Sequence, residues 1–124
     1  MSYLIVFYIL NATLLLLHEI ESAYEKEWEI LNLPGKITGF LLLHIPIIFL
    51  FFFGLLELYN QTTLGMIIAI ITGVGGIIPF VVHKLLVKRN DRFNRLISNI
   101  IIILNIITGF GTIVLSIIYM SHIF

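Results

Sequence analysis

Four long apolar stretches account for most of this chain. They cover residues 2–20, 37–58, 63–87 and 96–120. A helix needs about 20 apolar residues to cross the hydrocarbon core of a bilayer, which is ~30 Å thick. Because only short connections remain between the stretches, we predict one integral membrane domain over residues 1–124. Its expected fold is all-α, a four-helix transmembrane bundle with up-down, antiparallel topology.

The composition supports a membrane protein and excludes several other classes. Hydrophobic residues make up 60% of the 124 residues, and the mean hydropathy is +1.11. Both values lie outside the range of soluble globular proteins. Cysteine is absent, which excludes disulfides and thiolate metal ligands. The chain lacks a glycine-rich phosphate loop and a G-x-S-x-G motif. Its few basic residues crowd the connections between helices, so nucleic-acid binding is not expected.

Positive charge is distributed unevenly between the connections. All seven Lys and Arg residues lie in the first-to-second and third-to-fourth connections, and none lies in residues 59–63 or at either terminus. Short loops rich in Lys and Arg remain in the cytoplasm. We therefore expect the two charged hairpins to be cytoplasmic and both termini to lie outside.

Helical periodicity predicts where the helices begin and end. His18, Glu21, Glu25 and Glu29 follow a 3-4-4 spacing, typical of one helical face, so the first helix is expected to continue to residue 29. The complete set of predicted helices covers residues 2–29, 37–58, 63–88 and 94–121.

Two stripes of small or polar residues are expected to face the bundle interior, because small residues let membrane helices approach closely and polar groups need partners there. The third helix carries its stripe at spacings of 4, 3, 4, 3 and 4: Gly65, Ala69, Thr72, Gly76, Pro79 and His83. The fourth helix carries Ser98, Asn105, Thr108 and Thr112.

Three histidines on three different helices are expected at a similar depth. His18 is near the end of the first helix, His44 is near the start of the second, and His83 is near the end of the third. At about 1.5 Å per residue, each lies within about 10 Å of the cytoplasmic surface. Antiparallel packing would bring the three together. Ionisable residues inside a membrane are costly and usually functional.

A carboxylate near this histidine layer completes a predicted metal site. Glu21 follows His18 by three residues, so both can reach one ion from the same helix. Three imidazoles and one carboxylate suit zinc or iron. The sequence therefore predicts His18, Glu21, His44 and His83 as metal ligands. Glu25, one turn further on, is the predicted catalytic base that takes a proton from metal-bound water.

Other polar residues are assigned supporting roles. Glu19 and Glu27 fall on other faces of the predicted first helix, where interfacial contacts or ion pairs are expected. The fourth helix offers side chains that could orient ligating imidazoles through hydrogen bonds, namely Asn94, Ser98 and Asn99.

Three functions remain open at this point. The first is a metal-binding protein, extended to a metal-dependent enzyme acting on a lipid or another membrane-embedded substrate. The second is a haem protein with His44 and His83 as axial ligands, in which the small residues of the third helix make room for the porphyrin. The third is a non-enzymatic transport or accessory subunit. Membrane lipids are expected partners in each case, and association with further copies or another membrane protein stays open.

Several short motifs resemble those of a family of small prokaryotic membrane proteins. They are L-H-E-I-E-S-A-Y-E-K-E-W-E followed by L-P, then H-I-P, then a histidine closing the third helix and R-F-N-R-L-I-S opening the fourth. The family has unknown function and is marked by H-E-x-[DE]…E-W on helix one and H-x-P on helix two. The resemblance implies a prokaryotic plasma membrane but no known reaction. It also implies these motif residues: His18, Glu19, Glu21, Glu25, Trp28, His44 and His83.

A second group of small membrane proteins, marked by H-x-x-E-E, is similar in style. It fits less well, because Ser22 follows Glu21 and the adjacent acid pair is absent.

Overall fold

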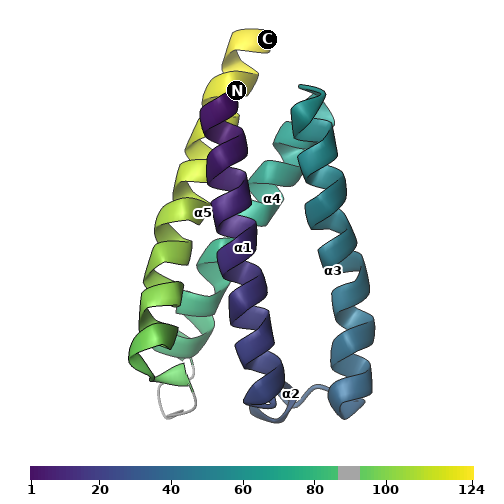
Figure 1. Ribbon diagram of the computed structural model, residues 1–124, viewed down its shortest axis with the longest axis vertical. Coiled ribbons are helices and arrows are strands. Elements are labelled where there is room, and N and C mark those ends of the chain that lie inside the picture. The colour runs from purple at the N-terminus through teal and green to yellow at the C-terminus, as the bar shows by residue number, and fades with distance from the viewer. Residues whose placement is uncertain (87–92) are drawn as a thin grey trace.

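The computed structural model describes residues 1–86 and 93–124, and within them the chain is helical without strands. Four helical spans in this described part are long and apolar enough to cross a membrane: Ser2–Tyr24, Lys36–Tyr59, Thr63–Leu86 and Leu96–Ile123. The predicted all-α class and four helices that could span a membrane are therefore confirmed. The elements, shown in Figure 1, are α1 (Ser2–Tyr24), α2 (Glu27–Ile30), α3 (Lys36–Tyr59), α4 (Thr63–Phe80), the π-helical η1 (Val81–Leu86) and α5 (Leu96–Ile123).

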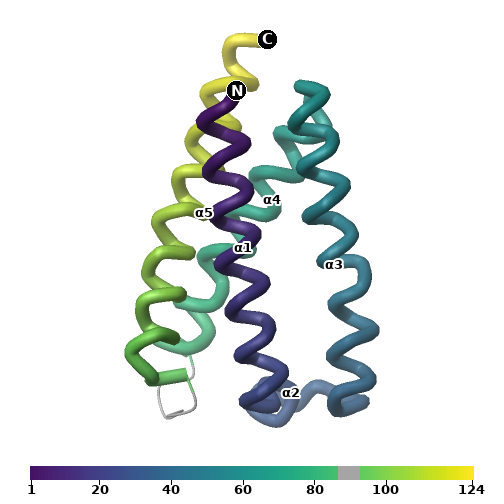
Figure 2. The backbone as a smooth tube through the Cα atoms, viewed as in Figure 1, coloured from purple at the N-terminus to yellow at the C-terminus, as the bar shows by residue number. Residues whose placement is uncertain are grey.

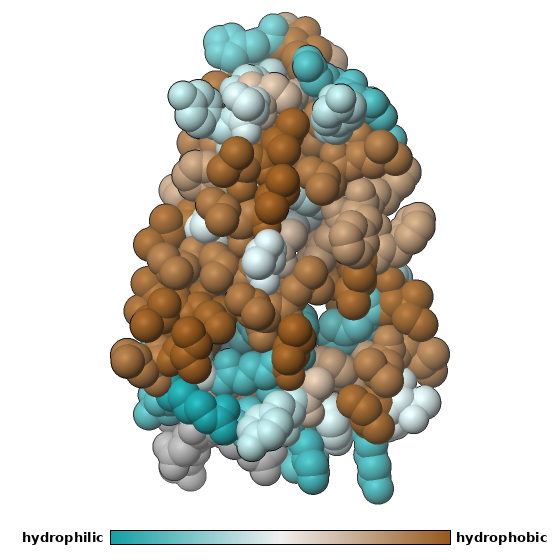
Figure 3. Space-filling model, viewed as in Figure 1, coloured by the Kyte–Doolittle hydropathy of each residue, from teal (hydrophilic) through white to brown (hydrophobic). Residues whose placement is uncertain are grey.

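Helices α1 and α4 each contact the other three long helices, and the most extensive contact is between α4 and α5. Both chain termini lie at one end of the molecule, and α2 lies at the other (Figure 1). Contacts agree with this arrangement. Leu4 and Leu58 pack together at the first end, whereas Trp28 packs on Phe40 at the second. The surface between the two ends is largely hydrophobic, and hydrophilic residues gather towards the ends (Figure 3).

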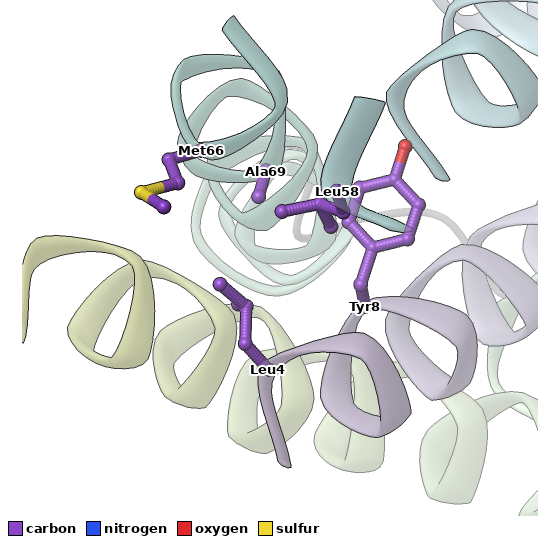
Figure 4. Packing of buried hydrophobic residues seen from close by; sticks show 5 residues of the cluster. All are labelled: Leu4, Tyr8, Leu58, Met66 and Ala69. Carbon is purple, nitrogen blue, oxygen red and sulfur yellow. The ribbon is translucent and has the colours of Figure 1, made fainter. Parts of the chain in front are cut away.

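A small hydrophobic core fixes the end near the termini. Figure 4 shows side chains from α1, α3 and α4 meeting there. The five buried members of this cluster are Leu4, Tyr8, Leu58, Met66 and Ala69. At the start of α4, the Thr62 hydroxyl accepts a hydrogen bond from the Gly65 backbone N–H at 2.9 Å. This N-cap satisfies a donor that the helix itself leaves without a partner.

The predicted stripes on the third and fourth helices are buried, as expected. All six small or polar positions from Gly65 to His83 are buried. The four polar positions of α5 are buried as well. Asn11 on α1 links the two stripes: its side-chain N–H donates to the Thr72 carbonyl oxygen at 2.8 Å, and the Thr108 hydroxyl donates to its Oδ1 at 3.3 Å. Within the described part of the chain, Thr72 Oγ1 and both polar side-chain atoms of Asn105 are buried without a hydrogen-bond partner.

The first helix is shorter than its periodicity predicts. It ends at Tyr24, and Lys26 takes a left-handed conformation with φ of 52°. The four-residue helix α2 follows and runs beneath α1, as the backbone trace in Figure 2 shows. Glu21 on α1 and Glu29 on α2 therefore do not share the continuous helical face that the spacing predicts.

The third span also departs from a regular α-helix. Its α-helical part ends at Phe80 and continues as a π-helix to Leu86. Pro79 lies directly before this change, and proline removes a backbone donor and disturbs the preceding turn. Single-turn π segments occur frequently at functional sites. The last two residues of the predicted third helix, 87 and 88, lie outside the described residues, as do Arg89 and Arg92, which the charge argument also used.

Removing the Tyr8 hydroxyl should weaken the fold modestly. This hydroxyl donates to the Phe51 carbonyl oxygen at 2.7 Å and links α1 to α3. Tyr8→Phe should lower the free energy of unfolding by about 1 kcal/mol, since one buried hydrogen bond is lost. Denaturation in mixed micelles measures this. Tyr3→Phe, at a side chain that is 73% exposed, is the matched control, and equal effects of the two variants would contradict the assigned bond.

Candidate metal centre

Two of the three predicted histidines meet in the structure. His18 on α1 is 2% exposed and His83 on η1 is 5% exposed. Their ring centroids lie 5.1 Å apart. Phe93, which is 1% exposed, stacks on the His83 ring at 3.9 Å and lies 5.4 Å from the His18 ring. The two imidazoles are therefore held side by side and covered by an aromatic ring.

Glu27 joins these histidines from α2. His83 Nε2 donates to Glu27 Oε1 at 2.9 Å. One ligand atom from each of His18, Glu27 and His83 lies within 4.8 Å of the others, so the three residues could hold a metal ion. The left-handed residue Lys26 makes this possible, because it turns the chain back beneath α1.

Each of the two histidines also has a buried ring nitrogen that lacks a hydrogen-bond partner in the described part of the chain, Nδ1 in both cases. A buried polar atom without a partner costs free energy, and each such atom requires an explanation. A cation bound between the rings would supply the missing partner.

The environment of Glu27 favours its anionic form. Burial raises the pKa of this carboxyl. Hydrogen bonds from His83 and Ser22, together with the charges on His18 and His83, outweigh burial and hold the pKa below its ordinary value. A carboxylate that stays ionised is ready to accept a cation.

His44, the third predicted histidine ligand, has other partners. Its Nδ1 lies 2.6 Å from the Phe40 carbonyl oxygen, and its Nε2 lies 2.6 Å from Glu19 Oε2. A carbonyl oxygen can only accept, so Nδ1 carries a hydrogen. The His44–Glu19 pair must then share a further proton, because Nε2 and Oε2 are within hydrogen-bond distance. Both ring nitrogens are thus engaged, and His44 lies outside the cluster of His18, Glu27 and His83.

The structure also places Glu21 and Glu25 elsewhere. Arg95 Nη2 lies 2.6 Å from Glu25 Oε1, and Arg95 Nη1 lies 3.6 Å from Glu21 Oε1. The Ser98 hydroxyl donates to Glu21. These contacts turn both carboxylates towards α5. The predicted fourth ligand, Glu21, and the predicted base, Glu25, therefore form an ion-pair network with Arg95 instead of joining the histidines.

The hydrogen-bonding residues of the fourth helix likewise serve other groups. Ser98 binds Glu21, while the Lys84 ammonium donates to the Asn99 side-chain oxygen and to the Phe93 carbonyl oxygen, the latter at 3.3 Å. Asn99 in turn donates to Asn94 Oδ1 at 3.4 Å. These side chains tie η1 and α1 to α5, and the described contacts do not include one to an imidazole.

Sequence reasoning missed Glu27 and Phe93. A continuous helix to residue 29 puts Glu27 on a different face from His18, and only the turn at Lys26 reverses this placement. A left-handed lysine has no marker in the sequence, since this conformation is most frequent for glycine and asparagine. Phe93 lies in a charged connection, where a buried aromatic ring is not expected from hydropathy.

Fold and site together define a class: an integral membrane protein of four long helices with a buried histidine–carboxylate cluster that could bind a metal. The chain belongs to the DUF6713 family, a family of unknown function, whose sequence profile matches residues 4–119. This match includes all three members of the cluster. No curated protein and no solved structure matches the sequence.

Proposed function

We propose that this protein binds a divalent transition metal, zinc or iron, through His18, Glu27 and His83. The observation that carries the proposal is the convergence of three ligand atoms within 4.8 Å from three separate elements. The unpartnered Nδ1 atoms of the two histidines support it independently. Two imidazoles and one carboxylate are also the donor set of several catalytic zinc sites, in which one coordination position stays open.

We extend the proposal to a metal-dependent enzyme that acts on a membrane-embedded substrate. His18, Glu27 and His83 would hold the zinc or iron ion, which would supply Lewis acidity and activate water for attack. The chain contributes orientation, because Phe93 stacks on His83 and Glu27 accepts its Nε2 hydrogen. Glu19 replaces Glu25 as the carboxyl group beside the cluster, since it lines the same cavity as His18 and His83.

The site lies, in this proposal, at the cytoplasmic side of a prokaryotic plasma membrane. The described basic residues all lie at the end of the molecule that holds the cluster: Lys26 directly before α2, Lys36 at the start of α3, Lys84 in η1 and Arg95 directly before α5. Positive charge at one end favours a cytoplasmic location for that end. A haem between His44 and His83 is less favoured, because both ring nitrogens of His44 already have partners. A non-enzymatic transport or accessory role remains the competing function.

Two carboxylate variants separate the sequence-based ligand set from the one that the structure supports. Glu27→Gln should weaken zinc binding by more than about 100-fold, because losing a ligand exceeds the about 10–100-fold effect of losing an outer-shell partner. Glu21→Gln should leave affinity nearly unchanged, since Glu21 contacts Arg95 and Ser98. Metal content of purified protein by plasma mass spectrometry, followed by zinc titration, measures both.

Wild-type protein without bound metal after a chelator-free purification, and without zinc uptake in the titration, would overturn the proposal. A stronger effect of Glu21→Gln than of Glu27→Gln would return the assignment to the sequence-based ligands.

A further inference from the structure

A cavity of about 510 Å³ extends from the histidine–carboxylate cluster into the membrane-spanning part of the protein. This volume lies within the range of about 300–1,000 Å³ typical of small-molecule sites. Its polar lining at one end comes from the three cluster residues, His18, Glu27 and His83, and from Glu19. Most of the remaining lining is apolar and comes from α1, α3 and α4. The cavity thus has a polar head and a hydrophobic body.

The length and opening of the cavity fit a hydrocarbon chain. Helix α4 and η1 line it from Ile70 to His83, and these thirteen steps correspond to about 20 Å at 1.5 Å per residue. One leaflet of the hydrocarbon core is about 15 Å thick. Ile71, Val74 and Ile78 line the cavity and are about half exposed. The cavity therefore opens on the lipid-facing surface.

The polar end restricts the head group. Phe93 contacts both histidine rings but does not line the cavity, so it closes the side of the cluster away from the cavity. A divalent ion with two neutral imidazoles and one carboxylate keeps one positive charge and an open coordination position. A small anionic group would fill that open position.

We propose that the cavity binds a long-chain fatty acid, with its carboxylate at the metal and its hydrocarbon chain along α4. The position of the carboxylate in this inference rests on the proposed metal site, whereas the position of the hydrocarbon chain rests on the cavity alone. The substrate or product of the site is then a single-chain carboxylate from the surrounding membrane.

Photolabelling tests the inference with palmitic acid that carries a diazirine on its chain, added to zinc-loaded protein in phosphatidylcholine vesicles. Label should concentrate on the peptide that contains Val74, Gly75 and Ile78. Unlabelled palmitic acid should compete, whereas methyl palmitate, which has the same chain and no charge, should compete about tenfold less well, corresponding to about 1.4 kcal/mol of binding free energy. Equal competition by the two would overturn the carboxylate assignment.

A cavity-filling variant provides the second arm. Gly75 lines the cavity, and a Cβ atom there would meet only Leu15 Cδ1 at 3.5 Å. Gly75→Phe should therefore fill the cavity and reduce labelling about tenfold, equivalent to about 1.4 kcal/mol. Ile67→Phe, on the lipid-facing side of α4 at 43% exposure, is the matched control. Gly75→Leu serves if the phenylalanine variant does not fold.

Zinc content of the same samples separates this inference from the metal proposal. Retained zinc with labelling that is insensitive to Gly75→Phe, or spread evenly over α5, overturns the fatty-acid site alone. Absence of zinc with labelling that Gly75→Phe still abolishes overturns the metal assignment and supports the hydrocarbon chain in the cavity.

Discussion

Replacing His83 by alanine should lower zinc affinity by about 100- to 1,000-fold. Structural zinc sites with four ligands bind with about 10–16 kcal/mol, or about 3–4 kcal/mol per ligand, and every 1.4 kcal/mol is tenfold in affinity. His83 is buried between Glu27, which accepts its hydrogen bond, and Phe93, which stacks on its ring. Alanine at this position offers no ligand atom to replace the imidazole. Competition with a chromophoric zinc chelator measures the affinity of the variant and the wild type.

Two further histidine variants make this test specific. His44→Ala should retain most of the zinc affinity, because His44 contacts Glu19 and Phe40. His122→Ala is the surface control, since His122 is exposed near the end of α5. The double variant of His18 and His83 should lose zinc binding altogether, because only the Glu27 carboxylate of the site remains. Unchanged zinc affinity in the two single variants would indicate that the histidines only contribute to packing.

A large loss of stability should come from adding one methyl group where α4 crosses α5. A Cβ atom at Gly73 would lie 2.7 Å from the Gly109 carbonyl oxygen and 2.7 Å from Ile113 Cγ1. A Cβ atom at Gly109 would likewise lie 2.6 Å from the Gly73 carbonyl oxygen. Because the helix backbones themselves are in the way, Gly73→Ala should cost about 2–3 kcal/mol, at the upper end of typical overpacking.

The matched control for this variant is two residues away. Gly75→Ala places its new methyl group 3.5 Å from Leu15 Cδ1, which is ordinary contact. Alanine is preferred over glycine in a helix by about 0.5–1 kcal/mol, so Gly75→Ala should be neutral or stabilising. Unfolding of both variants in mixed micelles measures the difference. Similar stabilities for the two would contradict the close crossing of α4 and α5.

Long-range periodicity predicted most of the fold. The four spans follow from hydropathy, and the buried stripe of α4 follows from small residues at alternating spacings of three and four. Such patterns reflect the membrane environment and helix packing, which act on every turn of a helix. They require no knowledge of how the connections fold. Even so, hydropathy did not reveal the π-helical turn after Pro79, because it depends on local backbone geometry.

The candidate site was predictable only in part. The similar expected depth of His18 and His83 in the membrane predicted that they lie close together, and both belong to the cluster. The carboxylate next to the two histidines is Glu27 rather than the Glu21 that periodicity predicts, because the helix ends at Tyr24 and the chain reverses at Lys26. To identify which glutamate between residues 19 and 29 reaches the histidines, one must know where the chain turns. Helical spacing also could not predict the ion pair between Glu25 and Arg95, because these residues lie on segments far apart in the sequence.

The division of the cluster among α1, α2 and η1 has a consequence for how the protein is made. His18 and Glu27 belong to the first part of the chain to be synthesised, whereas His83 closes the third span. A nascent chain that has inserted only its first hairpin therefore carries two of the three groups and lacks the third. The proposed centre would be complete only after the third span has entered the bilayer, so a metal would be bound at a late stage of membrane insertion.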